Sequence, residues 1–237
     1  MADPNDLAVV RQGAAMIAEW RSHNPRTQLD LSQASLSGMD LAQADLSGAD
    51  LFGADLDGAN LEGASLEKAT LTGASLAGAT LTRSRLGEAM LSNANLHGAH
   101  LEEANLARAT LASATLVGST FTRAILESAI LDGANLDDAD FTGAILAKAD
   151  LVGADLVSVT FTGVDFSGAR MGTASLAGCD LSSCRGLANV EHVWPSPIGV
   201  DTLVRTLRGL GGKCHRRPWH SLRRLACLQH CWSRYRR

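Results

Sequence analysis

The sequence predicts an all-β solenoid in which the chain winds a square coil, and three observations predict it. A large apolar residue stands at every fifth position from Leu31 to Leu181, 31 times without an insertion. A small residue, usually Ala, stands two positions before it, and Gly or another small residue often stands two positions after it. Five residues advance about 140° on an α-helix, which would spread these leucines over every side. Short extended pieces separated by corners instead direct every Ala and Leu inward.

Residues 1–28 precede the repeats and predict an amphipathic helix over residues 6–22. Its apolar residues share one face: Leu7, Val10, Ala14 and Ile17. Asn5 or Asp6 is placed to cap its first turn, and Asn24-Pro25 ends it. We expect this helix to cover the first coil, because an open edge of backbone N–H and C=O groups invites association.

The array itself occupies residues 29–184. Its interior residue is Leu at 26 of the 31 positions. The other five positions hold Phe121, Phe141, Phe161, Phe166 and Met171. If four repeats make one coil, the phenylalanines at 121, 141 and 161 stack in one interior column. Thirty-one repeats then make nearly eight coils and a rod on the order of 37 Å long.

The repeat pattern A-(D/N/S)-L-x-G, as in Ala44-Asp45-Leu46-Ser47-Gly48, resembles the pentapeptide repeat family. The resemblance covers about two-thirds of the chain. It implies a right-handed quadrilateral β-helix of about eight coils, with four pentapeptides in each coil. It also implies a protein that binds partners. The glycines follow the repeat and make no phosphate-binding loop, and no Ser/His/Asp set stands out. We therefore expect no enzyme, no cofactor and no metal.

Charge divides the chain into an acidic array and a basic tail. The array holds 20 acidic and 7 basic residues, a net charge of −13, whereas residues 202–237 hold 10 basic residues and no acid. An acidic array repels phosphates, which argues against nucleic acid as its ligand. The quinolone-resistance members of the family bind DNA gyrase as DNA mimics, and the resemblance implies this type II topoisomerase as one candidate partner. The candidate acids are Asp45, Asp50, Asp55, Asp140, Asp150 and Asp155.

A second candidate surface is apolar. The residue before each interior Leu points outward and is normally polar, but four large apolar residues occupy that position: Met90, Ile125, Ile130 and Ile145. Exposed apolar patches on soluble proteins are usually contact sites. The alternatives are a general protein-interaction scaffold that uses this patch and simple sequence drift at a permissive position.

Residues 185–212 predict a loop followed by an amphipathic helix that either caps the last coil or pairs with its copy in a homodimer. The apolar face of this helix consists of Val200, Leu203, Val204, Leu207 and Leu210. Residues 186–203 resemble a segment that follows pentapeptide arrays in larger bacterial proteins, which implies a shortened relative of a signalling or defence protein. We expect the basic segment 213–237 to be disordered, since its Cys and His residues lack paired C-x2-C spacing.

The location of the chain follows from two absences in the sequence. The N-terminus lacks the basic and apolar regions of a secretory signal, and no apolar run approaches the roughly 20 residues that span a bilayer. We therefore expect a cytoplasmic protein without a transmembrane segment.

Overall fold

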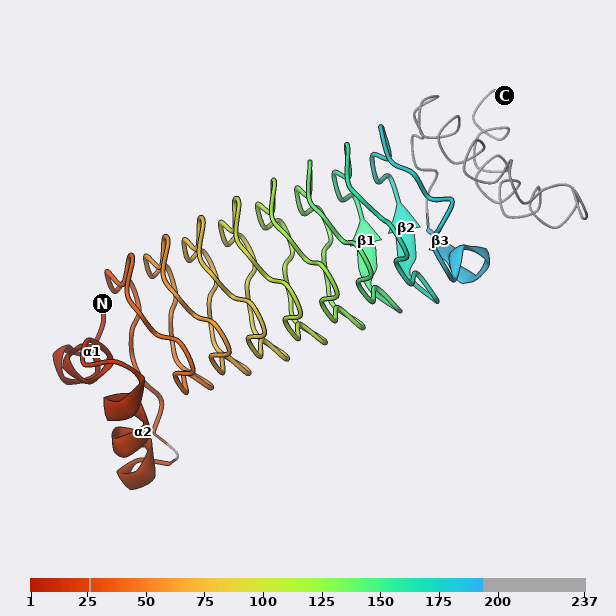
Figure 1. The fold of residues 1–237 in the computed structure, drawn as a ribbon. Helices are drawn as coiled ribbons and strands as arrows, with labels where there is room; N and C mark the ends of the chain where they lie inside the picture. The colour runs from red at the N-terminus through yellow and green to blue at the C-terminus, as the bar shows by residue number, and fades with distance from the viewer. Residues whose placement is uncertain (26, 194–237) are drawn as a thin grey trace, which may run out of the picture.

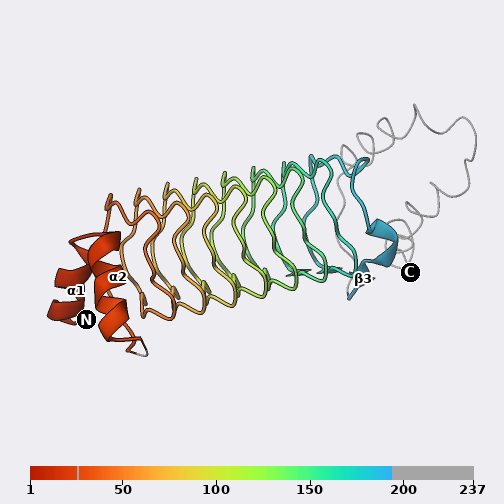
Figure 2. The ribbon, with the colours of Figure 1, turned by 60° about the horizontal axis from the view of Figure 1, so that its bottom comes forward.

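The computed structural model describes residues 1–25 and 27–193. Helices α1 (Pro4–Val10) and α2 (Ala14–His23) lie at the N-terminal end of a straight stack of coils, as Figure 1 shows. The short strands β1 (Asp150–Val152), β2 (Arg170–Gly172) and β3 (Glu191–His192) lie toward the other end, together with the 3-10 helix η1 (Leu187–Asn189). A view from a second side shows the same rod (Figure 2).

The coils are held together by parallel backbone bridges between residues twenty apart. The bridges begin at Asp30↔Asp50 and continue to Asp165↔Arg185, and β1 pairs with β2 in the same register. The N–H group of Leu51, for example, donates to the carbonyl of Thr70 at 2.7 Å. Four pentapeptides therefore complete one coil, and the array is a β-helix.

The interior of the array contains the small and large apolar residues that the five-residue period predicts. The Leu and Phe residues of this period are buried along the whole array, with at most 3% of their surface exposed. The predicted phenylalanine column is confirmed: the rings of Phe121 and Phe141 stack at 4.6 Å, and those of Phe141 and Phe161 lie 6.0 Å apart. Phe166 meets Phe161 edge-on at 5.2 Å.

Each corner is a four-residue turn that starts at the interior Leu. In one example, the N–H of Ala54 donates to the carbonyl of Leu51 at 3.0 Å, and Gly53 between them has a φ of +61°. Glycine occupies many of these positive-φ sites, and Lys68, Arg83 and other long side chains occupy others. A Cβ added at a corner such as Gly58 meets nothing within 4 Å, so the cost of a larger residue there is the backbone strain of a positive φ and not a steric clash.

The N-terminal segment forms two helices instead of the single predicted one. Gly13, with a φ of +86°, separates them in a conformation that favours glycine. The cap of α1 is Asp3, not Asn5 or Asp6, because Pro4 fits the first helical position and Asp3 accepts from the N–H of Asn5 at 2.8 Å.

Contacts between these helices and the first coil are both apolar and polar. Val10 and Ile17 are fully buried in the same core as the interior leucines. Asp6 accepts a hydrogen bond from the N–H of Asp30 at 2.8 Å, and Arg21 donates to the carbonyl of Ser47 at 2.8 Å. The helices thereby satisfy backbone groups that the first coil would otherwise leave open.

At the other end of the rod, β3 continues the array by one more parallel pairing with β2. The predicted helix at 200–210, with Val200, Leu203, Val204, Leu207 and Leu210, and the basic segment 213–237 lie outside the described residues. None of the helices in the described part of the chain is long and apolar enough to cross a membrane. A cytoplasmic location stays a prediction.

Candidate partner-binding surface

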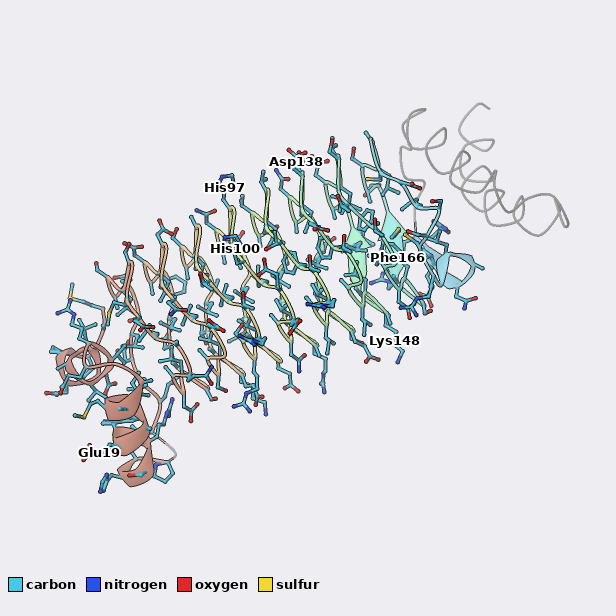
Figure 3. The ribbon with its side chains drawn as sticks, in the orientation of Figure 1. Glu19, His97, His100, Asp138, Lys148 and Phe166 are labelled. Carbon is cyan, nitrogen blue, oxygen red and sulfur yellow. The ribbon has the colours of Figure 1, made fainter. Side chains whose placement is uncertain are left out.

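Four outward faces run along the array, because each coil contains four pentapeptides. Face 1 starts at Asp30, face 2 at Ser35, face 3 at Asp40 and face 4 at Asp45, and each continues through every twentieth residue. Face 4 adjoins face 1 across a corner of the coil. Figure 3 shows Lys148 on that edge of the rod and His97 on the opposite edge.

The four predicted apolar residues are exposed and lie on these two adjoining faces. They form the isoleucine patch: Met90 (45% exposed), Ile125 (38%), Ile130 (41%) and Ile145 (37%). Ile125 and Ile145 are direct bridge partners on face 4. Met90 and Ile130 lie on face 1, each bridged to Thr110 between them. The patch therefore consists of the adjacent pair Ile125 and Ile145 on one side of a corner and of Met90 and Ile130, with Thr110 between them, on the other side.

Charges at this corner neutralise one another from coil to coil. Three ion pairs lie along it: Arg85–Glu67 at 3.6 Å, Arg108–Glu88 at 3.3 Å and Lys148–Glu127 at 3.3 Å. The last pair lies between Ile125 and Ile130, in the middle of the patch. Such exposed pairs contribute little to stability. Because these charges are paired with each other, the exposed apolar side chains are the distinctive feature of this corner.

Five of the six candidate acids have a structural role in the turns. Asp45, Asp50, Asp55, Asp140 and Asp150 each accept a hydrogen bond from the backbone N–H two residues later, at 2.8–3.2 Å. Asn60, Asn95, Asn105 and Asn135 make the same contact at 3.0–3.2 Å. Asn and Asp both favour this local turn. The carboxylates at these positions therefore have a local reason to be present that involves no partner.

Asp155 on face 2 is the sixth acid, and its environment differs. Its Oδ1 is buried and has no hydrogen-bond partner among the described residues. Asp137 of the preceding coil lies beside it and accepts from the N–H of Val157 at 3.0 Å. Burial and the charge of Asp155 raise the pKa of Asp137, against the lowering effect of the Val157 N–H. The two carboxyl groups thus form a like-charge pair.

Net charge is distributed unevenly along the rod. Residues 29–68 hold 8 acidic residues and 1 basic residue, and residues 129–168 hold 7 and 1, so these segments carry −7 and −6. Residues 69–128 between them hold 4 of each, a net charge of zero. Three coils span about 14 Å. The array is therefore acidic toward its two ends and neutral across its centre, which the total of −13 conceals.

Apart from the terminal Met1, two exposed apolar residues of the described chain were not predicted from the sequence, Phe52 and Val193. Phe52 is 49% exposed at the corner between faces 1 and 2, and Val193 is 41% exposed. A large apolar residue one position after an interior Leu is the sequence signal that identifies Phe52. Within residues 1–25 and 27–193, no group of three or more His, Cys, Asp or Glu side chains is arranged to hold a metal ion.

The family model for pentapeptide repeats matches this array in overlapping copies, over residues 30–67, 49–87, 69–108, 89–127, 126–156, 134–172 and 154–185. The chain belongs to the pentapeptide repeat family. No match was found among curated protein sequences.

Solved structures of pentapeptide repeat proteins resemble the chain. HetL, involved in heterocyst differentiation regulation in the cyanobacterium Nostoc sp. strain PCC 7120, is 27% identical over 77% of this chain and 99% of its own, with a TM-score of 0.32. QnrB1, a plasmid-mediated fluoroquinolone resistance protein, is 14% identical over 75% and 95%, with a TM-score of 0.49. Rfr23 from the cyanobacterium Cyanothece 51142 is 28% identical over 51% and 90%, with a TM-score of 0.39.

Proposed function

We propose that this chain is a non-enzymatic protein-interaction scaffold whose partner contacts the isoleucine patch. The observation that carries the proposal is the exposure of four large apolar side chains on two adjoining columns, at a position that is polar in most other repeats. A cluster of exposed apolar side chains on a protein surface usually marks an interaction site. In this arrangement, residues 1–28 form the cap and residues 29–184 present the surface.

The charge around the patch favours an apolar contact over an electrostatic one. The ion pairs of the corner are made within the array, and residues 69–128, which include Met90 and Ile125, have no net charge, whereas Ile130 and Ile145 lie in the acidic segment 129–168. Salt screens contacts between exposed charges and leaves buried apolar contacts intact. We therefore expect affinity for the partner to change less than about threefold between low and moderate salt.

Replacement of Ile125 and Ile145 by Ser tests the proposal. Each isoleucine is a little over a third exposed, so its further burial contributes about 0.6–1.1 kcal/mol, and the double variant is expected to bind the partner about 10-fold more weakly or worse. The measurement is affinity capture from cell extract, followed by titration of the captured protein. The matched control is Phe52→Ser, which removes an exposed apolar residue outside the patch. Equal capture by both variants contradicts the proposal.

A second candidate is a DNA mimic that binds a type II topoisomerase, DNA gyrase, as proposed from the acidic charge. Face 2 and the corner that leads from it to face 3 favour it, since together they carry five carboxylates and, within residues 29–184, no Lys or Arg: Asp55, Asp57, Asp137, Asp138 and Asp155. The neutral centre of the rod weighs against it, because duplex DNA carries about one charge per 1.7 Å without interruption.

Inhibition of gyrase supercoiling by the purified chain separates the two candidates. The DNA-mimic candidate predicts inhibition that weakens as salt rises and that is reduced by Asp137→Asn with Asp138→Asn. Ile125→Ser with Ile145→Ser is the control and leaves such inhibition unchanged. Absence of inhibition at low micromolar protein and low salt removes gyrase as the partner.

A further inference from the structure

The sequence beyond the described residues complements the end of the array from which it emerges. Residues 194–237 comprise 44 residues, and residues 202–237 carry 10 basic side chains and no acid. The adjacent coils, residues 129–168, carry seven acids, and their one basic residue, Lys148, is paired with Glu127 of the preceding coil. Oppositely charged segments of one chain have a high effective concentration for each other.

The described chain leaves the array on the face that contains part of the isoleucine patch. β3 pairs with β2 in the register Arg170↔Glu191, and the N–H of Val193 donates to the carbonyl of Met171 at 2.9 Å. The same column of face 1 contains Ile130 and Asp150 in the preceding coils. Glu191 is three coils from Ile130, which is about 14 Å along the rod.

Length permits the C-terminal segment to reach the patch and to cover it. Residues 194–199 span at most about 20 Å when extended, which exceeds the distance back to Ile130. The helix that the sequence predicts over residues 200–210 would be about 16 Å long. The patch extends from Met90 to Ile145, slightly under three coils or about 13 Å. The apolar residues expected on one face of that helix match the patch in both length and chemistry.

We propose that residues 200–237 dock on the array of their own chain. In this arrangement Val200, Leu203, Val204, Leu207 and Leu210 cover the isoleucine patch, and the basic side chains lie against the acidic coils 129–168. The segment then competes with any external partner for the patch. That competition rests on the proposed function, whereas the docking itself does not.

Photo-crosslinking of the full chain tests the docking. The crosslinker p-benzoylphenylalanine replaces Glu127, the exposed residue between the two apolar columns, and the adduct is mapped by mass spectrometry in an equal mixture of labelled and unlabelled chains. We expect crosslinks to residues 200–210 within one chain. A crosslinker in place of His97, on the opposite edge of the rod, serves as the control and is expected to give none (Figure 3).

Two double variants test whether apolar contacts hold the segment on the patch. Ile125→Ser with Ile145→Ser, and separately Leu203→Ser with Leu207→Ser, are each expected to lower the crosslink yield about tenfold or more, because buried apolar contacts are lost. Phe52→Ser is expected to leave the yield unchanged. Crosslinks between labelled and unlabelled chains would show that a second copy covers the patch, and crosslinks that avoid residues 200–237 would show that the segment lies elsewhere; either result overturns the proposal. No external partner enters the assay, so its failure is distinguishable from failure of the proposed function.

Discussion

The inward and outward columns of the same coils obey different rules. Inward positions repeat Leu or Phe and Ala with few exceptions, and nearly all are fully buried. Outward positions on the same backbone vary more: face 4 alone includes Asp, Ser, Arg, Asn and Ile. Alternation along an extended segment separates the two sets, since neighbouring side chains point to opposite sides. Stability is therefore determined inside the rod, and the surface can vary without disturbing it.

The largest effect on the stability of the array is expected when a charged side chain is placed at an inward-facing position. Leu101→Asp buries an unpaired carboxylate between stacked coils, which costs about 4 kcal/mol or more and is expected to unfold the array. Circular dichroism during thermal unfolding measures it. The outward control is Asn105→Asp, at a position where Asp side chains hold turns elsewhere, with an expected change below about 0.5 kcal/mol. Equal stability of the two variants would show that the interior register is wrong.

An effect of intermediate size is expected at a strained corner. Thr173 is β-branched and has a φ of +54°, a conformation that costs about 1–3 kcal/mol for such a residue. Thr173→Gly removes that strain and is expected to raise stability by about 1 kcal/mol, after the entropy that glycine adds to the unfolded chain. Thr72→Gly, one position after an interior Leu and without a positive φ, is expected to lower stability. A loss at both positions in chemical denaturation would contradict this account of the corners.

The smallest effect is expected on the outer surface, at the Asp137–Asp155 pair. In the corresponding place of an earlier coil, the hydroxyl of Ser75 donates to Asp57, whereas Asp155 presents a second carboxylate to Asp137. The raised pKa of Asp137 means that the folded state binds a proton more tightly than the unfolded state. Stability therefore falls as pH rises through the region above the ordinary value of 3.8, and the penalty is fully present at neutral pH.

Asp155→Asn removes the part of this penalty that comes from the second carboxylate and supplies a donor, whereas the part that comes from the burial of Asp137 remains. We expect a gain of a few tenths of a kcal/mol, at most about 1, at pH 7, and a smaller gain near pH 3.5. Melting temperatures at the two pH values measure it. The reciprocal variant Ser75→Asp places a carboxylate beside Asp57 and is expected to lower stability at pH 7 only. A gain for Asp155→Asn that grows as pH falls would reverse the sign argued here.

Most of the fold follows from the five-residue period, because one interior environment repeats in every coil. The period predicts that Leu101 points inward and that Phe121 stacks on Phe141, and the stack is confirmed. The N-terminal cap was less predictable: the apolar spacing of Val10 and Ile17 suits one long helix as well as two, and only the left-handed conformation of Gly13 distinguishes them.

The exposure of the patch could also be predicted from the five-residue period, because Ile125 and Ile145 each stand one position before an interior Leu and therefore point outward. The roles of the acidic residues could not be predicted from the period. Whether a carboxylate holds a turn or faces another carboxylate depends on its neighbours in the next coil, which are twenty residues away. Asp150 and Asp155 are five residues apart in equivalent positions of consecutive repeats, yet only Asp150 is shown accepting from the N–H two residues later.

The unbroken register has a consequence for how such a protein changes its length. Removal of twenty residues takes out one whole coil and leaves every column in line, so that the rod becomes shorter and its faces are kept. Removal of five residues preserves the interior equally well but turns everything beyond the cut by a quarter of a revolution. A deletion of five before Met90 would carry the whole isoleucine patch onto different edges relative to α1 and α2. An insertion or deletion of five residues in such a chain therefore rotates the surface on one side of the change relative to the surface on the other side.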